Sequence, residues 1–331
     1  MNEFRVTRRA GLRAALAGAA TAITGLPAWA AETWPSRPVK LEVGFTAGGA
    51  VDNVARQTGL ALGGKLGQSF IIENRAGATG TLAADFVAKA APDGYTLLLG
   101  TQSTMLVAPA VYPKLPFKPL EDLVPVSLIG SVPLVLAVHP SLPVHNVKEL
   151  IALAKAQKGE LAYASSGQGG PQHVATELLK QMAGIDMVHV PYKGESMAIN
   201  DAMGGQVKVL FGNLPTMLPA VQSGKLRAIA VSSLQRAEAA PDIPTVAESG
   251  LPGFEALTWF GLFAPKGTPT PIVTRLYSEL HASLNNAEVA DRLKAQGLTL
   301  VGSDPEHFRA YMKVESVKWA KLVQSAKIKP E

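Results

Sequence analysis

Two glycine-rich segments carry the residues of this chain that could bind an anion. The first elbow is residues 39–52 (VKLEVGFTAGGAVD), and the second elbow is residues 161–173 (LAYASSGQGGPQH). In each, an apolar run precedes the glycines and a helix is expected to follow. Glycines leave backbone N–H groups uncovered, and the first N–H groups of a helix have no partner inside that helix. With the positive end of the helix dipole, such amides favour a carboxylate or a phosphate.

The first elbow offers backbone donors and one hydroxyl. Gly48 and Gly49 permit a left-handed backbone and close approach of a ligand, and Thr46 adds a side-chain hydroxyl. Asp52 is a weaker candidate, because a carboxylate in the first turn of a helix favours capping and orientation over ligand contact. Taken alone, this segment is explained equally well by a strand-to-helix turn that binds nothing.

The second elbow is richer in polar groups. Ser165 and Ser166 supply hydroxyls, and Gly167, Gly169 and Gly170 open the backbone. We expect Ser166 to be the side-chain donor to a bound carboxylate. His173 falls in the first helical turn and is a weaker candidate, because a histidine there more often has a structural hydrogen bond. An ordinary capped helix start remains the alternative for the isolated segment.

Three other loops place polar side chains after expected strands, where open α/β sheets bind ligands. A lysine in such a loop could attract an anion and a tyrosine could wall a cleft, although a solvated lysine is the simpler interpretation. The candidates are Tyr192 and Lys193 in residues 190–194, Gln102 and Ser103 in residues 101–104, and Asn213 and Thr216 in residues 211–216.

Catalytic and metal-binding patterns are lacking in the sequence. Ser165 and Ser166 are not preceded by the glycine of a Gly-x-Ser-x-Gly elbow. The six histidines form no His-x-x-x-His pair, and there is no cysteine. Residues 59–65 resemble a P-loop only superficially, because Leu66 stands where magnesium requires a hydroxyl. We therefore expect no enzyme, no metal and no cofactor.

The first 30 residues are typical of an export signal. Four arginines precede an apolar stretch over residues 14–26, and Ala28 and Ala30 match the small-x-small cleavage pattern. Residues 7–13 resemble a twin-arginine signal, so the export route stays open. We expect cleavage near Ala30 and a periplasmic product, with neither a disulfide nor a lipid anchor because the chain has no cysteine.

The charge of the chain gives no reason to expect a nucleic-acid partner. Its formal charge is +5, of which the first 30 residues contribute +3 from four arginines and one glutamate, leaving +2 for the rest. Such a weak excess lacks the basic footprint that nucleic-acid binding requires.

Apolar runs alternate with helical patterns along most of the 331 residues, which predicts α/β layers with largely parallel sheets. Residues 126–130 and 134–139 are expected to form two adjacent strands around a break at residues 131–133. That region and residues 257–263 are the candidate crossovers between two domains. Two crossovers would make the first domain discontinuous and the second an insertion.

Ordered landmarks through nearly the whole mature sequence resemble the extracytoplasmic solute receptors of tripartite tricarboxylate transporters, often called Bug receptors. One departure is Gly44, where the family usually has proline. The landmarks are residues 34–39, 45–52, 73–78, 92–97, 165–169, 190–194, 224–228, 244–245 and 259–262.

The resemblance implies an α/β type II periplasmic binding protein fold, with two lobes joined by a hinge of two crossing strands. Lobe 1 would comprise residues 31–132 and 259–331, and lobe 2 residues 133–258. The protein would bind a small organic carboxylate between the lobes and deliver it to the permease subunits of a tripartite tricarboxylate-type transporter, as a monomer. By family motif, the contacts would be Phe45, Thr46, Ala47, Gly48, Gly49, Ser165, Ser166, Gly167 and Gly169, with Gln102, Ser103, Asn213 and Thr216 at the rest of the ligand.

Two alternatives from other classes stay open on the sequence alone. One is a periplasmic sensor that signals to a membrane kinase, which the sequence does not separate from a transport receptor. The other is a secreted serine hydrolase that uses Ser166 with His173.

Overall fold

The computed structural model describes residues 34–112 and 114–329. The chain divides into two units, Met1–Ser36 and Arg37–Glu331, and every named helix and strand belongs to the second unit. The expected signal segment and its cleavage position lie outside the described residues. Within those residues, no helix is both long enough and apolar enough to span a membrane.

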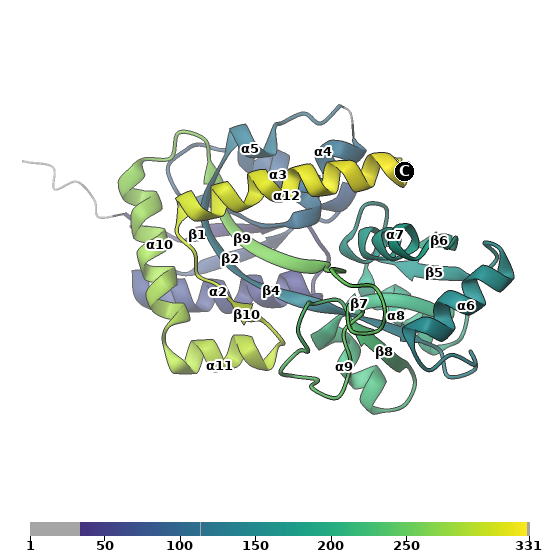
Figure 1. Cartoon of the computed structure of the whole chain (residues 1–331). Coiled ribbons are helices and arrows are strands. Elements are labelled where there is room, and N and C mark those ends of the chain that lie inside the picture. Colours follow the sequence, from purple (N-terminus) through teal and green to yellow (C-terminus); the bar gives the residue numbers. More distant parts are fainter. Residues whose placement is uncertain (1–33, 113, 330–331) are drawn as a thin grey trace, which may run out of the picture. The chain divides into compact units, whose positions relative to one another are not determined.

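The second unit alternates strands and helices, as Figure 1 shows. A 3₁₀ turn at Ala78–Gly80 and a π-helical turn at Ser103–Val107 interrupt the alternation. The strands are β1 (Val39–Val43), β2 (Phe70–Asn74), β3 (Thr96–Thr101), β4 (Leu123–Val138), β5 (Ala162–Ser165), β6 (Val188–Pro191), β7 (Val209–Asn213), β8 (Arg227–Val231), β9 (Leu257–Pro265) and β10 (Thr299–Leu300). The helices are α2 (Ala50–Leu66), α3 (Thr81–Ala88), α4 (Ala108–Val111), α5 (Pro119–Asp122), α6 (Val147–Gln157), α7 (Pro171–Ala183), α8 (Glu195–Met203), α9 (Leu214–Gln222), α10 (Thr270–Leu284), α11 (Ala287–Ala295) and α12 (Pro305–Ser325).

The strands pair in the order β2-β1-β3-β9-β4-β7-β5-β6, with β8 and β10 pairing with β4 off this path. Parallel pairs occur at both ends of the order: β1 with β2 and β3, and β5 with β6 and β7. The middle is antiparallel, through β9 and β4 and their neighbours. The α/β class is confirmed, but the expectation of largely parallel sheets is wrong for this central part.

One long strand, β4, replaces the two strands expected around residues 131–133. Ser131, Val132 and Pro133 stay in the ladder because β9 pairs with them through Trp259, Thr258 and Leu257. The same strand then continues against β7 and β8. β4 and β9 are thus the connection between the two parallel ends, in the place where crossovers are predicted. The lobe boundaries themselves stay a prediction.

Four of the parallel strands are each followed by a short glycine-containing loop and then by a helix. β1 leads into α2, β2 into α3, β5 into α7 and β6 into α8. β1 and β2 are adjacent and parallel, as are β5 and β6, so their carboxyl ends lie at shared edges. This topology brings four glycine-containing loops to the positions where α/β sheets bind ligands.

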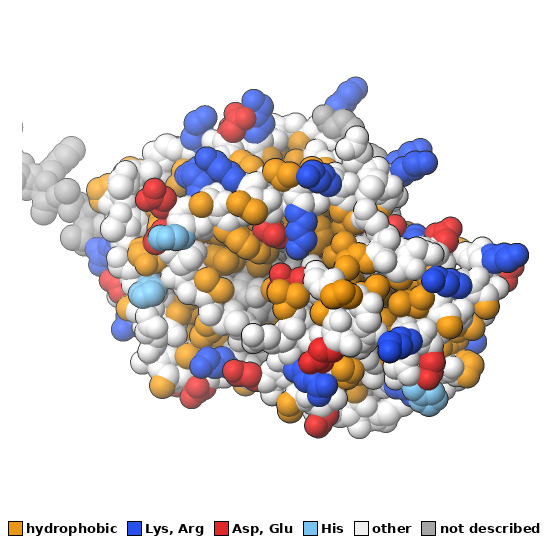
Figure 2. Space-filling model, viewed as in Figure 1, with side chains coloured by type: hydrophobic (Ala, Val, Ile, Leu, Met, Phe, Trp, Pro, Cys, Tyr) orange, Lys and Arg blue, Asp and Glu red, His pale blue; other side chains and the backbone are white. Residues whose placement is uncertain are grey.

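Helix α12 docks on the sheet through an aromatic cluster. The ring centroids of Trp259 and Phe308 are 5.4 Å apart, and those of Phe263 and Phe308 are 5.2 Å apart. Gly261 is required beneath them, because a Cβ there would lie 2.4 Å from the Phe308 ring. In Figure 2, Lys and Arg side chains gather over α12, while hydrophobic side chains crowd the surface beside it.

Candidate functional site

A cavity of about 570 Å³ lies where the four loops meet. The first elbow and the loop after β2 form one part of its wall, and the second elbow and the loop after β6 form another. The lining residues are Gly44, Phe45, Thr46, Ala76, Gly77, Ala78, Thr79, Gly80, Tyr112, Ser166, Gly167, Gln168, Gly170, Pro191, Tyr192, Lys193 and Gly194.

Three helices begin at glycines that line this cavity. Gly80 precedes α3, Gly170 precedes α7 and Gly194 precedes α8, and none of these N-cap positions has a side-chain cap hydrogen bond. The helix starts therefore carry no side-chain acceptor of their own at this position. Because each helix start is also the positive end of a dipole, the cavity wall favours a negative group. Lys193 adds the one charged side chain of the lining, and no acidic residue is among the lining residues.

Asp52 organises the first elbow from behind the cavity. Its buried carboxylate accepts hydrogen bonds from the Gly48 amide at 3.0 Å, from Asn74 at 3.0 Å and from two nitrogens of Arg56 at 2.9 and 3.0 Å. Burial alone would raise the pKa of Asp52, but these hydrogen bonds hold it below its usual value. Gly48, at φ 81°, donates its N–H inside the protein, so this amide does not face a ligand.

The second elbow is fixed by internal hydrogen bonds as well. The amide of Gly169 donates to Nδ1 of His173 at 2.9 Å, and the amide of Gly167 donates to Oγ of Ser165 at 3.1 Å. Ser165 is fully buried and bonds Nε2 of His189 at 2.6 Å. The rings of His173 and His189 stack with centroids 3.8 Å apart. These contacts fix the shape of the loop, and of the residues that make them only Gly167 lines the cavity.

Both histidines are held neutral. Burial lowers the pKa of His173 to about 3, with the charges of His189 and Lys180 adding to the shift. Burial likewise lowers the pKa of His189 to about 4, together with the charge of Lys180. The pair is therefore a packing element of the second elbow rather than a proton carrier near neutral pH.

Ser166 reaches the cavity and belongs to a polar chain behind it. Its hydroxyl donates to Oε1 of Gln172, and Nε2 of Gln172 donates to Oε1 of Glu195 at 3.1 Å. Glu195 also accepts from the backbone N–H and the side-chain amide of Asn213, at 2.5 and 2.9 Å. Burial raises the pKa of Glu195, against the lowering effect of these hydrogen bonds.

Contacts across the cavity wall join segments that are distant in the sequence. The hydroxyl of Thr79, in the 3₁₀ turn after β2, donates to the backbone carbonyl of Gln168 in the second elbow at 2.7 Å. Gly44 packs against Gly80 so closely that a Cβ on Gly44 would lie 2.4 Å from the Gly80 backbone. The departure from proline at position 44 thus coincides with a close approach that leaves no room for a side chain.

Six of the residues predicted for the site line the cavity: Phe45, Thr46, Ser166, Gly167, Tyr192 and Lys193. The others lie outside the lining: Ala47, Gly48, Gly49, Asp52, Gln102, Ser103, Ser165, Gly169, His173, Asn213 and Thr216. Among these, Gln102, Ser103 and Asn213 are buried, and each has a side-chain oxygen without a hydrogen-bond partner among the described residues. Contact of any of these residues with a ligand stays a prediction.

Sequence reasoning missed the loop after β2 as part of the site. Residues 76–80 line the cavity, and Thr79 bridges it, although residues 73–78 stand out in the sequence only as a family landmark. The available signal was composition, since the segment RAGATGT follows an apolar run and is small and glycine-containing. Gly170 belongs to the predicted second elbow and Gly194 to the candidate loop of residues 190–194, but neither is among the contacts that the sequence predicts.

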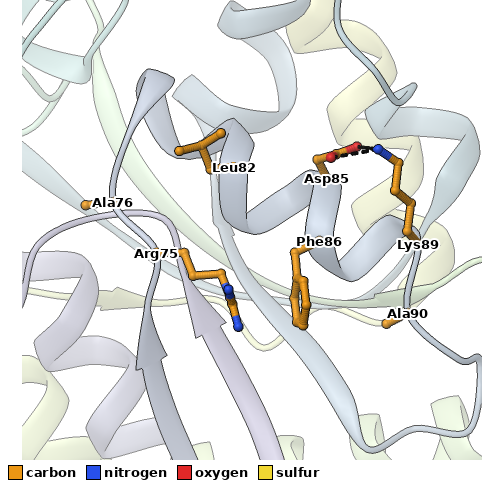
Figure 3. Close-up of a pocket in the computed structure, with 7 residues that line it drawn as sticks. All are labelled: Arg75, Ala76, Leu82, Asp85, Phe86, Lys89 and Ala90. Carbon is orange, nitrogen blue, oxygen red and sulfur yellow. Dashed lines mark hydrogen bonds and ion pairs between the residues drawn. The ribbon is translucent and has the colours of Figure 1, made fainter.

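A neighbouring pocket on the other side of the same loop does not compete with this site. Figure 3 shows Arg75 beside Phe86, with the Arg75 guanidinium 3.9 Å from the ring centroid. Arg75 is already paired with the buried Glu42 at 2.7 Å, and Lys89 pairs with Asp85. The charged groups there already have partners within the protein, and the ion pair of Arg75 with Glu42 holds the loop after β2 in place.

The serine-histidine pair of the hydrolase alternative is not assembled. Ser166 donates to Gln172, and His173 accepts from Gly169, so neither bonds the other. Ser165 does bond His189, but Ser165 is fully buried. Among the described residues, no group of three or more His, Cys, Asp or Glu side chains could hold a metal ion.

Glycine-capped helix starts around a cavity, on an α/β frame with two connecting strands, define a solute-binding protein. The sequence matches the model of the tripartite tricarboxylate transporter family receptor over residues 54–328, and the chain belongs to that family. It is a receptor and not an enzyme.

Relatives and solved structures agree with this assignment. Protein BugT of Bordetella pertussis is 40% identical over 332 residues, which is 99% of this chain and 100% of that protein. The structure of R. palustris Rpa4515 with adipate has a TM-score of 0.86 and 38% identity, covering 90% of this chain and 100% of that one. MatC from Rhodopseudomonas palustris with bound malate has a TM-score of 0.82 and 34% identity, covering 88% and 100%.

The Asp52 network predicts a large loss of stability on substitution. Asp52→Ala leaves the Gly48 amide without its acceptor and removes one of the two acceptors of the Asn74 side-chain amide, which costs about 2–3 kcal/mol of unfolding free energy. Glu288→Ala is a matched control, because Glu288 also lies in the first turn of a helix and pairs with an arginine four residues later, but is 80% exposed. It should cost less than about 0.5 kcal/mol. Urea denaturation measures both; equal losses would contradict the assignment.

The neutral histidine pair predicts acid sensitivity. An unfolded histidine takes up a proton near pH 6.5, whereas His173 and His189 stay neutral to about pH 3 and 4. The unfolded state therefore binds more protons as the pH falls below 6.5, and each histidine lowers the unfolding free energy by about 1.4 kcal/mol per pH unit down to about pH 4.

His173→Gln tests this, because glutamine removes the titratable ring and keeps a polar side chain of similar length at this position. Denaturation at pH 7, 6 and 5 should show a shallower dependence for this variant than for the unchanged protein. His145→Gln, at an exposed histidine, is the control and keeps the original dependence. Parallel curves for His173→Gln and the unchanged protein would show that His173 does not contribute.

Proposed function

We propose that this protein is a receptor that binds a small carboxylate in the cavity and delivers it to the permease subunits of a tripartite tricarboxylate-type transporter. The observation that carries the proposal is the cavity wall: three glycine-capped helix starts, one lysine and no acidic side chain. A wall of backbone donors with a positive bias suits a carboxylate, because charge-assisted hydrogen bonds to such a group are the strong ones.

Family relatives support the ligand class. The two solved structures with ligands contain adipate and malate, which are both dicarboxylates. By similarity, we propose that the ligand lies against the second elbow and the loop after β6, with Ser166 and Gly167 beside it and a carboxylate nearest to Lys193. Phe45 and Thr46 would contact it from the first elbow. The cavity of about 570 Å³ has room for a ligand of this size.

The proposal includes closure of two lobes over the ligand. Lobe 1 would comprise residues 31–132 and 259–331, and lobe 2 residues 133–258, with β4 and β9 as the hinge. The hydrogen bond from Thr79 to Gln168 would then join the lobes beside the ligand. A ligand that contacts both lobes stabilises the closed state, which the transporter would recognise.

We place the protein in the periplasm after cleavage near Ala30, acting as a monomer. A solved relative described as periplasmic binding protein BugD, with a TM-score of 0.83 and 35% identity, supports this location.

A thermal-shift screen against small acids tests the ligand class. At about 100 times Kd, ligand binding adds about 2.7 kcal/mol to the unfolding free energy, so the melting temperature rises visibly. We expect shifts with members of a dicarboxylate panel from malonate to adipate, and none with the corresponding diamides, which lack the charge. A diamide that shifts the melting temperature as much as its acid would contradict the carboxylate proposal.

Lys193→Met tests the positive bias of the wall. Loss of this cation should weaken binding of the best dicarboxylate by about tenfold, because one charge-assisted contact is removed. Lys225→Met removes an exposed lysine outside the cavity lining and should leave the calorimetric Kd unchanged. Unchanged affinity in the Lys193 variant would place the carboxylate elsewhere.

A further inference from the structure

We infer that Glu195 and Gln172 fix the Ser166 hydroxyl as a hydrogen-bond acceptor toward the cavity, so that the site selects a carboxylic acid bearing a hydroxyl group. The inference rests on the proposed function, because it concerns the ligand of the same cavity. It assigns Glu195 and Gln172, which do not line the cavity, as positioning residues for ligand specificity.

Glu195, Gln172 and Ser166 form a chain of hydrogen bonds, and Glu195 sets the direction in which its members donate and accept. The partners of Glu195 are neutral donors: Nε2 of Gln172 at 3.1 Å, and the backbone N–H and Nδ2 of Asn213 at 2.5 and 2.9 Å. In each of these hydrogen bonds a carboxyl oxygen of Glu195 is the acceptor, so the neighbouring groups face it with their N–H donors. Glu195 therefore determines which end of the Gln172 amide faces it.

Gln172 transmits this choice to Ser166. Its side chain is buried, with only 2% of the residue exposed, so solvent does not offer its amide other partners. With its NH₂ group on Glu195, its oxygen must face Ser166. The reversed amide would place an oxygen against the Glu195 carboxylate and an NH₂ group on Ser166, which exchanges a hydrogen bond for a contact between two acceptors.

The Ser166 hydroxyl has a single proton, and it is donated to Gln172. Toward the cavity, Oγ of Ser166 therefore presents only lone pairs, so it can accept a hydrogen bond from a ligand but cannot donate one. This differs from the donor role that the sequence suggested for Ser166. A carboxylate oxygen placed against this acceptor would be repelled, whereas a ligand O–H or N–H would donate to it.

The charge of the cavity favours a hydroxyl over an ammonium group. Lys193 is the one charged residue of the lining, and no Asp or Glu lines the cavity to balance a ligand cation. A neutral hydroxyl satisfies Ser166 without that cost. The ligand class is therefore a hydroxycarboxylate, with its hydroxyl at Ser166 and its carboxylate on the backbone donors.

Matched acids that differ by one substituent test this directly. Calorimetry at pH 8 would compare malonate, succinate, glutarate and adipate with their 2-hydroxy derivatives, and aspartate with succinate. At the chain length that binds best, we expect the hydroxy acid to bind about tenfold more tightly than its parent, as for one added hydrogen bond to a desolvated acceptor. Aspartate should bind more weakly than the hydroxy acid.

Two variants separate positioning from folding, because the readout is the ratio of two Kd values and not either value alone. Ser166→Ala should bring the ratio of parent to hydroxy acid to about one. Glu195→Gln keeps the size of the side chain but adds donors, which frees the Gln172 amide to reverse, so the ratio should fall to about threefold or less. Thr176→Val is the matched control: its hydroxyl, one turn further along α7, bonds only the Gln172 backbone, and the ratio should stay near tenfold.

The outcomes are distinguishable from failure of the proposed function. If no acid of the panel binds, the receptor proposal fails, and this inference fails with it. If the acids bind but parent and hydroxy acid bind equally well to the unchanged protein, the carboxylate proposal stands and the acceptor role of Ser166 is overturned. Aspartate binding more tightly than the hydroxy acid would overturn the choice of a hydroxyl, and an unaltered ratio in Glu195→Gln would remove Glu195 from the chain.

Discussion

The site depends on helix starts that lack side-chain caps. A helix N-terminus normally receives a hydroxyl, carboxylate or amide oxygen from its own N-cap residue, at a gain of about 1 kcal/mol. Here α3, α7 and α8 begin at glycine instead, and all three glycines line one cavity. Each start forgoes that local stabilisation, so the first-turn amides that a cap would satisfy have no acceptor from the N-cap residue. The proposed receptor function depends on a bound anion taking the place of the missing side-chain caps.

The topology of the sheet brings several of these helix starts to one cavity. A single uncapped helix start would be a weak site, because the dipole effect fades within one turn and is screened by solvent. Parallel pairing of β1 with β2 and of β5 with β6 sends two loops to each of two edges. Internal contacts then stiffen those loops: Asp52 holds the first elbow, and the stacked His173 and His189 support the second. Loop shape is thus preset, so less ordering is needed when a ligand binds.

Local sequence was enough to predict both elbows and the α/β class, since glycine-rich turns between apolar runs and helical patterns are visible in short windows. It was not enough for the loop after β2, because the place of that loop in the site depends on which strands are neighbours. The continuity of β4 through Pro133 was missed for a similar reason: its partner β9 lies more than a hundred residues later. The direction of the Ser166 hydrogen bond could not be predicted either, since it depends on how the side chains of Gln172 and Glu195 meet in the folded protein.

Backbone amide chemical shifts give the most direct test of the central claim, that several helix starts bind one carboxylate together. In a ¹⁵N-labelled sample titrated with the dicarboxylate that gives the largest thermal shift, we expect the strongest perturbations in four segments at once: residues 44–46, 76–81, 166–172 and 192–195. Perturbations confined to one of these segments, or centred on a different cavity, would contradict that claim.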